Sequence, residues 1–134
     1  MPKVVARRRK GYAHDVEMEG GHTLVSDEPE SVGGADEGPS PTRLLAASLA
    51  ACTAITIEMY AERKKWPLEQ LEVEVDMEYG KPSTPKSFNV ILRLPKGLSE
   101  EQTDRLRAIA GHCPVHRALK HEIDVTVVDR VELI

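Results

Sequence analysis

Two cysteines and their neighbours are the residues of this chain best suited to chemistry. Cys113 directly precedes Pro114 in the stretch AGHCPVHRALKH, with His112 and His116 close by. If a helix begins at Pro114, Cys113 is its N-cap residue, and the unpaired amides at that end favour a thiolate. The pattern alone is compatible with a reactive thiol, a metal ligand or a small residue that simply packs at a helix start.

The other cysteine, Cys52, has a different setting. It lies within LLAASLAACTAITI, where no neighbouring residue carries a charge that would favour ionisation. Alone, such a cysteine is typical of an apolar core. Ser48 and Thr56 lie one helical turn to either side, where their hydroxyls either bond weakly to the sulfur or satisfy backbone carbonyls.

A zinc site built from the two cysteines with His112 and His116 is a further alternative. The chain has neither a C-x-x-C pair nor an H-E-x-x-H helix, and adjacent residues such as 112 and 113 rarely both reach one ion. We therefore expect no bound metal and no resident cofactor.

The apolar and polar pattern predicts the elements that must position these thiols. In order, they are two or three antiparallel strands within 3–27, a loop over 28–41, a long helix over 41–65, strands over 71–79 and 87–95, helices over 99–111 and 114–121, and a strand over 122–134. Ser40 before Pro41 and the capping box from Ser99 to Gln102 support two helix starts. The order indicates an α+β fold with antiparallel sheets.

The long helix carries no charge between Leu44 and Ile57, which is typical of a helix buried on all sides. That uncharged run is shorter than the 18 or so residues expected of a membrane span, so we expect no membrane association. A chain of this size has too little material to surround such a helix. We expect an obligate homodimer, or else a helix that threads between two sheets of one chain.

Length and composition are those of one soluble domain. The 134 residues suit a single domain over 1–134, and 40% are apolar. The net charge of −4 and the 4% aromatic content argue against a nucleic-acid partner, although ARRRK is locally basic. The N-terminus has no apolar signal-peptide core, so we expect a cytoplasmic protein, in which a lasting disulfide is rare.

Three short motifs together resemble the OsmC/Ohr family of thiol peroxidases. They are GPSP at the start of the long helix, AACT within it, and the later CPVH, in that order. The resemblance implies an intertwined homodimer, with antiparallel sheets around two long buried central helices and active sites at the subunit interface. It also implies reduction of organic hydroperoxides, with hydrogen peroxide as a lesser candidate, by a Cys52 nucleophile that Cys113 resolves as a disulfide. An external dithiol would then reduce that disulfide.

In the family, an arginine on the N-terminal strands, within a pattern like G-R-x-G, activates the nucleophile. Here RRRKGY makes Arg9 the best match and Arg8 the next. Peroxidases of the family carry a glutamate just after the helix-starting proline, whereas this chain has Thr42 and Arg43. That difference leaves open slower reduction, a substitute acid such as Glu28 or Glu37, or another substrate.

We expect the substrate to be bound by a small set of polar residues, namely Thr42, Arg43, Ser48 and His116. The alternative to a peroxidase is a protein of the same fold that binds or carries a small apolar ligand.

Overall fold

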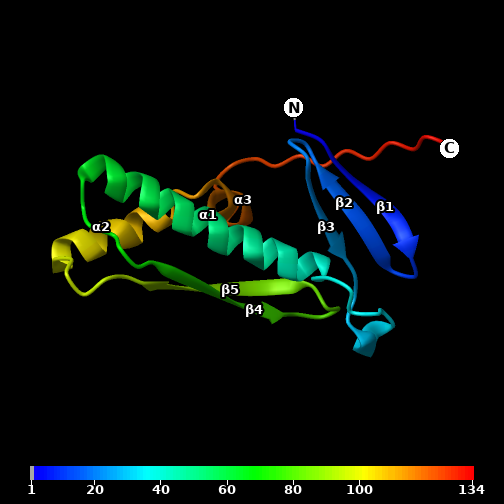
Figure 1. Cartoon of the computed structure of the whole chain (residues 1–134), viewed down its shortest axis with the longest axis horizontal. Coiled ribbons are helices and arrows are strands. Elements are labelled where there is room, and N and C mark those ends of the chain that lie inside the picture. Colours follow the sequence, from blue (N-terminus) through cyan, green and yellow to red (C-terminus); the bar gives the residue numbers. More distant parts are fainter. Residues whose placement is uncertain (1) are drawn as a thin grey trace. The chain divides into compact units, whose positions relative to one another are not determined.

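The computed structural model describes residues 2–134 and divides into two compact units, one ending at Ala47 and the other running from Ser48 to Ile134. The elements are antiparallel strands and helices (Figure 1), which confirms the α+β class with a long helix. The expectation of a single domain stays a prediction.

The first unit contains a three-stranded antiparallel sheet in the order β1–β2–β3 (Figure 1). Its strands are β1 (Val4–Lys10), β2 (Ala13–Met18) and β3 (His22–Ser26). Gly11 and the Gly20–Gly21 pair make the turns with positive φ, which glycine adopts without a steric cost. β1 is exposed along its whole length, as suits an edge strand rich in arginine.

The loop after β3 folds around one buried carboxylate. Asp27 accepts hydrogen bonds from the backbone N–H of Glu28 at 2.7 Å and from those of Ala35 and Glu37, each at 3.2 Å. A short 3-10 helix, η1 (Glu30–Val32), lies between these contacts. The loop is therefore ordered by its own hydrogen bonds.

The long helix α1 (Pro41–Lys64) begins where the sequence predicts and ends within one residue of the expected end. Ser40 caps it, because its Oγ accepts from the Arg43 N–H at 3.4 Å. At the other end, Lys65 adopts a φ of 58°, which terminates the helix.

One face of α1 is buried, not the whole circumference. The buried positions follow a helical spacing and are Leu49, Thr53, Ile57, Tyr60 and Ala61. On the opposite face Ile55 is 50% exposed and Met59 is 63% exposed. The single chain therefore covers one face of α1, and burial on all sides, which we expect to require a second copy, stays a prediction.

By length and composition alone, α1 is also apolar enough to cross a membrane, and 28% of that apolar window is buried within the chain. Part of the buried face of α1 packs against the protein core. The expectation of no membrane association stays a prediction.

The second unit places α1 along a two-stranded hairpin (Figure 1). Strands β4 (Glu72–Tyr79) and β5 (Pro85–Arg93) pair antiparallel, with Val75 opposite Val90, and the register shifts near Tyr79. The strict alternation of apolar and acidic residues predicts this hairpin, since one face is half-buried and the other solvated.

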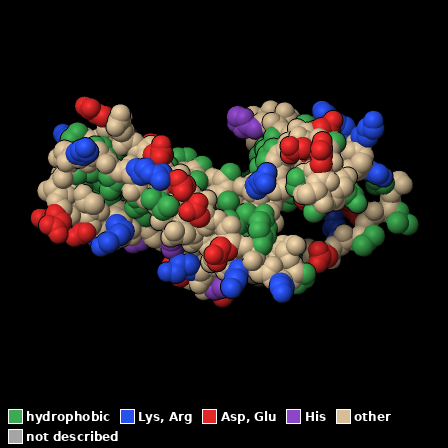
Figure 2. Space-filling view, turned by 90° about the horizontal axis from the view of Figure 1, so that it is seen from below, with side chains coloured by type: hydrophobic (Ala, Val, Ile, Leu, Met, Phe, Trp, Pro, Cys, Tyr) green, Lys and Arg blue, Asp and Glu red, His purple; other side chains and the backbone are tan. Residues whose placement is uncertain are grey.

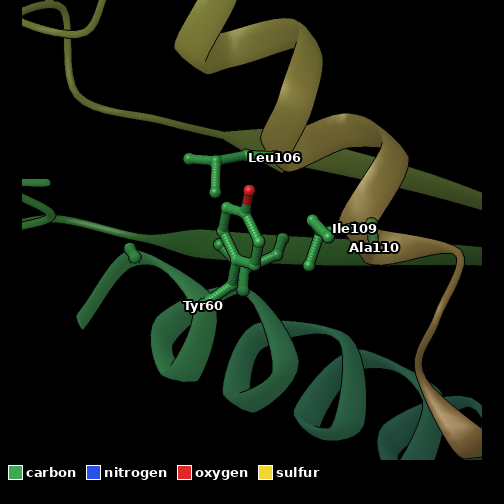
Figure 3. Packing of buried hydrophobic residues seen from close by; sticks show 6 residues of the cluster. Tyr60, Leu106, Ile109 and Ala110 are labelled. Atoms are coloured by element: carbon green, nitrogen blue, oxygen red, sulfur yellow. The ribbon is translucent and has the colours of Figure 1, made fainter. Parts of the chain in front are cut away.

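Two further helices complete the core. Helix α2 (Glu100–Ala110) begins with the predicted capping box, in which Ser99 and Gln102 exchange two hydrogen bonds. Tyr60 of α1 packs with Leu106, Ile109 and Ala110 of α2 (Figure 3). The short helix α3 (Pro114–Leu119) follows after a tight connection that carries Cys113.

The segment after α3 does not form the strand predicted over 122–134. It has no ladder partner within the described chain, and its apolar side chains lie open, with Val127 81% and Val131 85% exposed. Hydrophobic side chains also reach the surface elsewhere (Figure 2). The valine-rich sequence favours a strand, but a strand needs a neighbouring edge to pair with, and propensity alone does not supply one.

Candidate functional site

The two thiols lie side by side in the second unit. Cys52 is halfway along α1 and half-buried, whereas Cys113, between α2 and α3, is fully buried. Both are free thiols, and Cys52 is near enough to the Cys113 side chain to raise the pKa of that thiol. Two cysteines that are far apart in sequence are therefore neighbours in the fold.

Cys113 is the N-cap of α3, as the sequence predicts. Pro114 occupies the first helical position, and the Cys113 Sγ accepts from the His116 N–H at 3.4 Å. Burial raises the pKa of the Cys113 thiol, and the neighbouring Cys52 side chain raises it further, against a smaller lowering effect from the His116 amide. The local sequence favours a thiolate at Cys113, whereas its burial in this structure acts in the opposite direction.

Thr53 is the third side chain at this point. It is fully buried directly after Cys52, and its hydroxyl has no hydrogen bond of acceptable geometry among the described residues. It nevertheless lies close enough to the Cys113 sulfur to lower the pKa of that thiol. Thr53 is therefore a polar neighbour of the Cys113 sulfur, and the geometry between them is not that of a hydrogen bond.

His116 is the predicted substrate residue that lies nearest to the thiols, since its amide caps Cys113. Its Nδ1 is buried and has no hydrogen-bond partner among residues 2–134. The side chain lines two cavities, of about 330 and 590 Å³. A group with a free ring nitrogen at two cavities is well placed to contact a ligand.

The larger of these cavities is mainly apolar. Its walls come from β5 and α2 and include Val90, Ile91, Leu92, Leu94 and Ala110. Arg107 and His116 are the basic side chains at its wall. The cavity therefore suits a small ligand with an apolar body.

Ser48, another predicted substrate residue, lies one turn before Cys52 and is exposed. Thr42 and Arg43 occupy the first turn of α1, within the first unit, where Thr42 is half-buried and Arg43 is exposed. Of the four predicted substrate residues, the structure thus brings Ser48 and His116 into the unit that holds the thiols. The binding roles of all four stay predictions.

Arg9, the predicted activating residue, is on β1 and contacts a carboxylate of the neighbouring strand. Its Nη2 lies 2.9 Å from Asp15 Oδ1, and both side chains are about half exposed. Arg8 instead donates from Nε to the Gly11 carbonyl at 3.1 Å. Among the described residues, Arg9 thus forms an ion pair with Asp15, whereas Arg8 bonds to a backbone carbonyl.

The acid that contacts Arg9 in this structure is Asp15, and no ion pair of Arg9 with Glu28 or Glu37 is present among the described residues. The backbone N–H groups of both glutamates donate to the Asp27 carboxylate. Sequence reasoning missed Asp27 itself, although an aspartate at the end of a strand before a Gly- and Pro-rich segment is a recognised turn former. Burial opposes its ionisation, but the three backbone amides outweigh it, so the pKa of Asp27 lies below its ordinary value of 3.8.

The described residues, 2–134, contain no group of three or more histidine, cysteine or acidic side chains placed to hold a metal ion. Thiols such as Cys52 and Cys113 can ionise, be oxidised and form a disulfide.

Comparison with known proteins identifies the family. Residues 33–128 match the family described as OsmC-like protein, so the chain belongs to that family. An uncharacterised protein of Acinetobacter baylyi is 29% identical over 101 residues, which cover 72% of this chain and 70% of the relative.

Solved structures agree with this assignment. The OsmC-like protein of Mycoplasma pneumoniae has a TM-score of 0.77 at 17% identity, covering 90% of this chain and 87% of its own, and this likeness concerns the fold. An organic hydroperoxide resistance protein OsmC from Legionella pneumophila has a TM-score of 0.61 at 27% identity, covering 91% and 92%. The family includes proteins named for hydroperoxide resistance.

Proposed function

We propose that this protein is a thiol peroxidase that reduces organic hydroperoxides. The observation that carries the proposal is the pairing of a partly exposed cysteine, Cys52, with a fully buried one, Cys113. Of the two residues, Cys52 is the more accessible to a substrate from solution. Exposure thus favours Cys52 as the nucleophile and Cys113 as the resolving thiol, and the name of the Legionella relative supports the substrate class.

In the first step, the Cys52 thiolate attacks the terminal oxygen of the hydroperoxide. An S–O bond forms as the O–O bond breaks, sulfur gives up two electrons, and the alkoxide takes a proton and leaves as the alcohol. Cys52 is then a sulfenic acid.

In the second step, Cys113 attacks the sulfur of that sulfenic acid. An S–S bond forms, the S–O bond breaks, and the hydroxide leaves as water after taking the Cys113 proton. An external dithiol then reduces the disulfide by two thiol–disulfide exchanges and is itself oxidised. The cycle needs no cofactor.

The first step requires the Cys52 thiolate, and a nearby cation favours a thiolate over a thiol. We assign this role to Arg9 and propose that Asp15 orients its guanidinium. The 2.9 Å contact between Arg9 and Asp15 supports the assignment, since a paired guanidinium is held in one orientation. Asp15 would then perform the task of the glutamate that the family carries near Thr42 and Arg43.

The proposed activity is tested by turnover. Reduced protein is mixed with cumene hydroperoxide and a dithiol, and peroxide loss is followed with the Cys52→Ser variant as the matched control. We expect steady turnover by the parent and none above the uncatalysed rate in the variant. Equal rates with and without the Cys52 sulfur would overturn the proposal.

A second candidate function is the binding or transport of a small apolar ligand. The cavity of about 590 Å³ between β5 and α2, with its apolar wall, supports this candidate. Native mass spectrometry of the gently purified protein tests it. A retained small molecule that Leu92→Asp abolishes would support it, and an empty protein that shows no binding would remove it.

We further propose that the protein is a cytoplasmic homodimer. The apolar stripe of Ala51, Ile55 and Met59 on α1 is accessible in the single chain, and a second copy would cover it. Light scattering should give twice the monomer mass for the parent and a smaller mass for Ile55→Asp. Glu58→Gln, at an exposed position of the same helix, should remain dimeric, and a monomeric parent would contradict the proposal.

A further inference from the structure

The side chain next to the proposed nucleophile has an unusual environment. Thr53 is completely buried, yet its hydroxyl is left without a hydrogen bond among the described residues. A buried hydroxyl that makes no bond costs free energy, and a valine of nearly the same shape would avoid that cost. A hydroxyl at this position therefore suggests that it forms a hydrogen bond during the reaction.

The neighbour that can use this hydroxyl is the Cys113 sulfur. Cys113 is as fully buried as Thr53, and the groups around its sulfur are Cys52 and Thr53 from α1 and the His116 amide from α3. Among the described residues, the hydrogen-bond donor that the structure shows at this sulfur is the His116 amide, at 3.4 Å. The segment that contains Cys113 also carries the titratable side chains of His112, His116 and Arg117.

We propose that Thr53 is a positioning residue for the resolving thiol: its hydroxyl turns to donate a hydrogen bond to the Cys113 sulfur when that sulfur ionises. The inference rests on the proposed function, because it concerns the second step of that cycle. A buried thiolate lacks water as a donor, so one protein hydroxyl changes its ionisation strongly.

The same bond would act in both directions of the cycle. When Cys113 attacks the sulfenic acid, the hydroxyl favours loss of the thiol proton to the departing water. When the external dithiol attacks the disulfide at Cys52, Cys113 leaves as a thiolate, and the hydroxyl stabilises that leaving group. The first step, in which Cys52 meets the peroxide, does not involve this bond.

The test is a titration that needs no peroxidase activity. The background is Cys52→Ala, which leaves Cys113 as the single thiol and adds no new hydroxyl. Thiolate absorbance near 240 nm is followed against pH for this protein and for the same protein with Thr53→Val or Thr53→Ser. The matching signal from Cys52→Ala/Cys113→Ala is subtracted, which removes the tyrosine contribution.

We expect Thr53→Val to raise the midpoint by about one pH unit, or about tenfold less thiolate at a given pH, as loss of a hydrogen bond to a charged group implies. Thr53→Ser keeps a hydroxyl and should return the midpoint close to the parent value. A Val variant that titrates like the parent, or a Ser variant that titrates like Val, would overturn the inference.

Stability distinguishes this role from a structural one. Valine replaces an unbonded hydroxyl with a methyl group, so thermal unfolding of Thr53→Val should occur at or above the parent temperature. A clear loss of stability would show that the hydroxyl serves the fold and would count against the inference. Because these readouts use a protein without Cys52, they remain informative if the peroxidase proposal itself fails.

Discussion

Asp27 and Cys113 are both buried groups that can ionise, but they are bonded in opposite ways. Asp27 accepts three backbone N–H groups at 2.7 to 3.2 Å, and folding lowers its pKa. Cys113 accepts one N–H at 3.4 Å, and folding raises its pKa. The three donors favour the charged carboxylate, which orders the loop around it. The buried thiol has fewer donors, so its neutral form is favoured, although its proposed reaction requires the thiolate. The comparison indicates that a fully hydrogen-bonded group stabilises the fold, whereas a group with few hydrogen bonds is available for reaction.

The largest expected effect comes from removing the incompletely bonded group. Cys113→Ser should abolish the intramolecular disulfide, so the Cys52 sulfenic acid persists after one equivalent of peroxide and reacts with dimedone. Mass spectrometry of the treated protein measures this adduct. The parent should give little adduct, because Cys113 intercepts the sulfenic acid, and equal labelling of the two proteins would contradict the role of Cys113.

A smaller effect is expected from replacing Arg9, the cation proposed to favour the Cys52 thiolate. Arg9→Gln should slow the first, peroxide-dependent step by about a hundredfold, the usual scale for losing one charge-stabilising donor. Single-turnover loss of the free Cys52 thiol measures it. Arg8→Gln, at a neighbouring position of the same strand, is the matched control and should react within a few-fold of the parent. A reversed order would assign the activating role to Arg8.

The smallest effect concerns the completely bonded group and is one of stability. Because folding lowers the pKa of Asp27, its ionised form stabilises the protein above pH 3.8, and this contribution is lost as the pH falls through the lower folded-state value. Asp27→Asn should therefore unfold more easily than the parent in urea at pH 7, and the difference should be smaller at pH 3.

Asp36→Asn, an exposed change in the same loop, is the control for that experiment. It should leave the urea midpoint within error of the parent at both pH values, since asparagine tolerates the positive φ of 54° found there. A gap between parent and Asp27→Asn that stays constant with pH would show that the carboxylate charge is not what stabilises the loop.

Local patterns in the sequence predicted much of the fold. The Ser40–Pro41 start of α1, the capping box of α2 and the alternating β4–β5 hairpin all depend on residues close in sequence, and all three are present. The segment 122–134 was predicted as a strand and is not one, because strand formation depends on a pairing edge that no local pattern reveals.

The candidate site was less accessible to the same reasoning. The local sequence predicted the helix start at Cys113 and so favoured a thiolate there, but it gave no sign that Cys113 is buried. The proximity of Cys52 came from the family resemblance, and the unbonded Thr53 hydroxyl had no sequence signal. Contacts between α1 and the α2–α3 connection are set by tertiary packing, which spacing along the chain does not report.

Peptide mapping of the peroxide-treated protein tests the central claim most directly. Reduced protein receives one equivalent of cumene hydroperoxide, is alkylated, digested and analysed under nonreducing conditions. The account predicts one disulfide per chain, joining Cys52 to Cys113 within the same subunit and disappearing on treatment with a dithiol. Recovery of both cysteines as alkylated thiols, or of Cys52 oxidised beyond sulfenic acid beside a free Cys113, would contradict it.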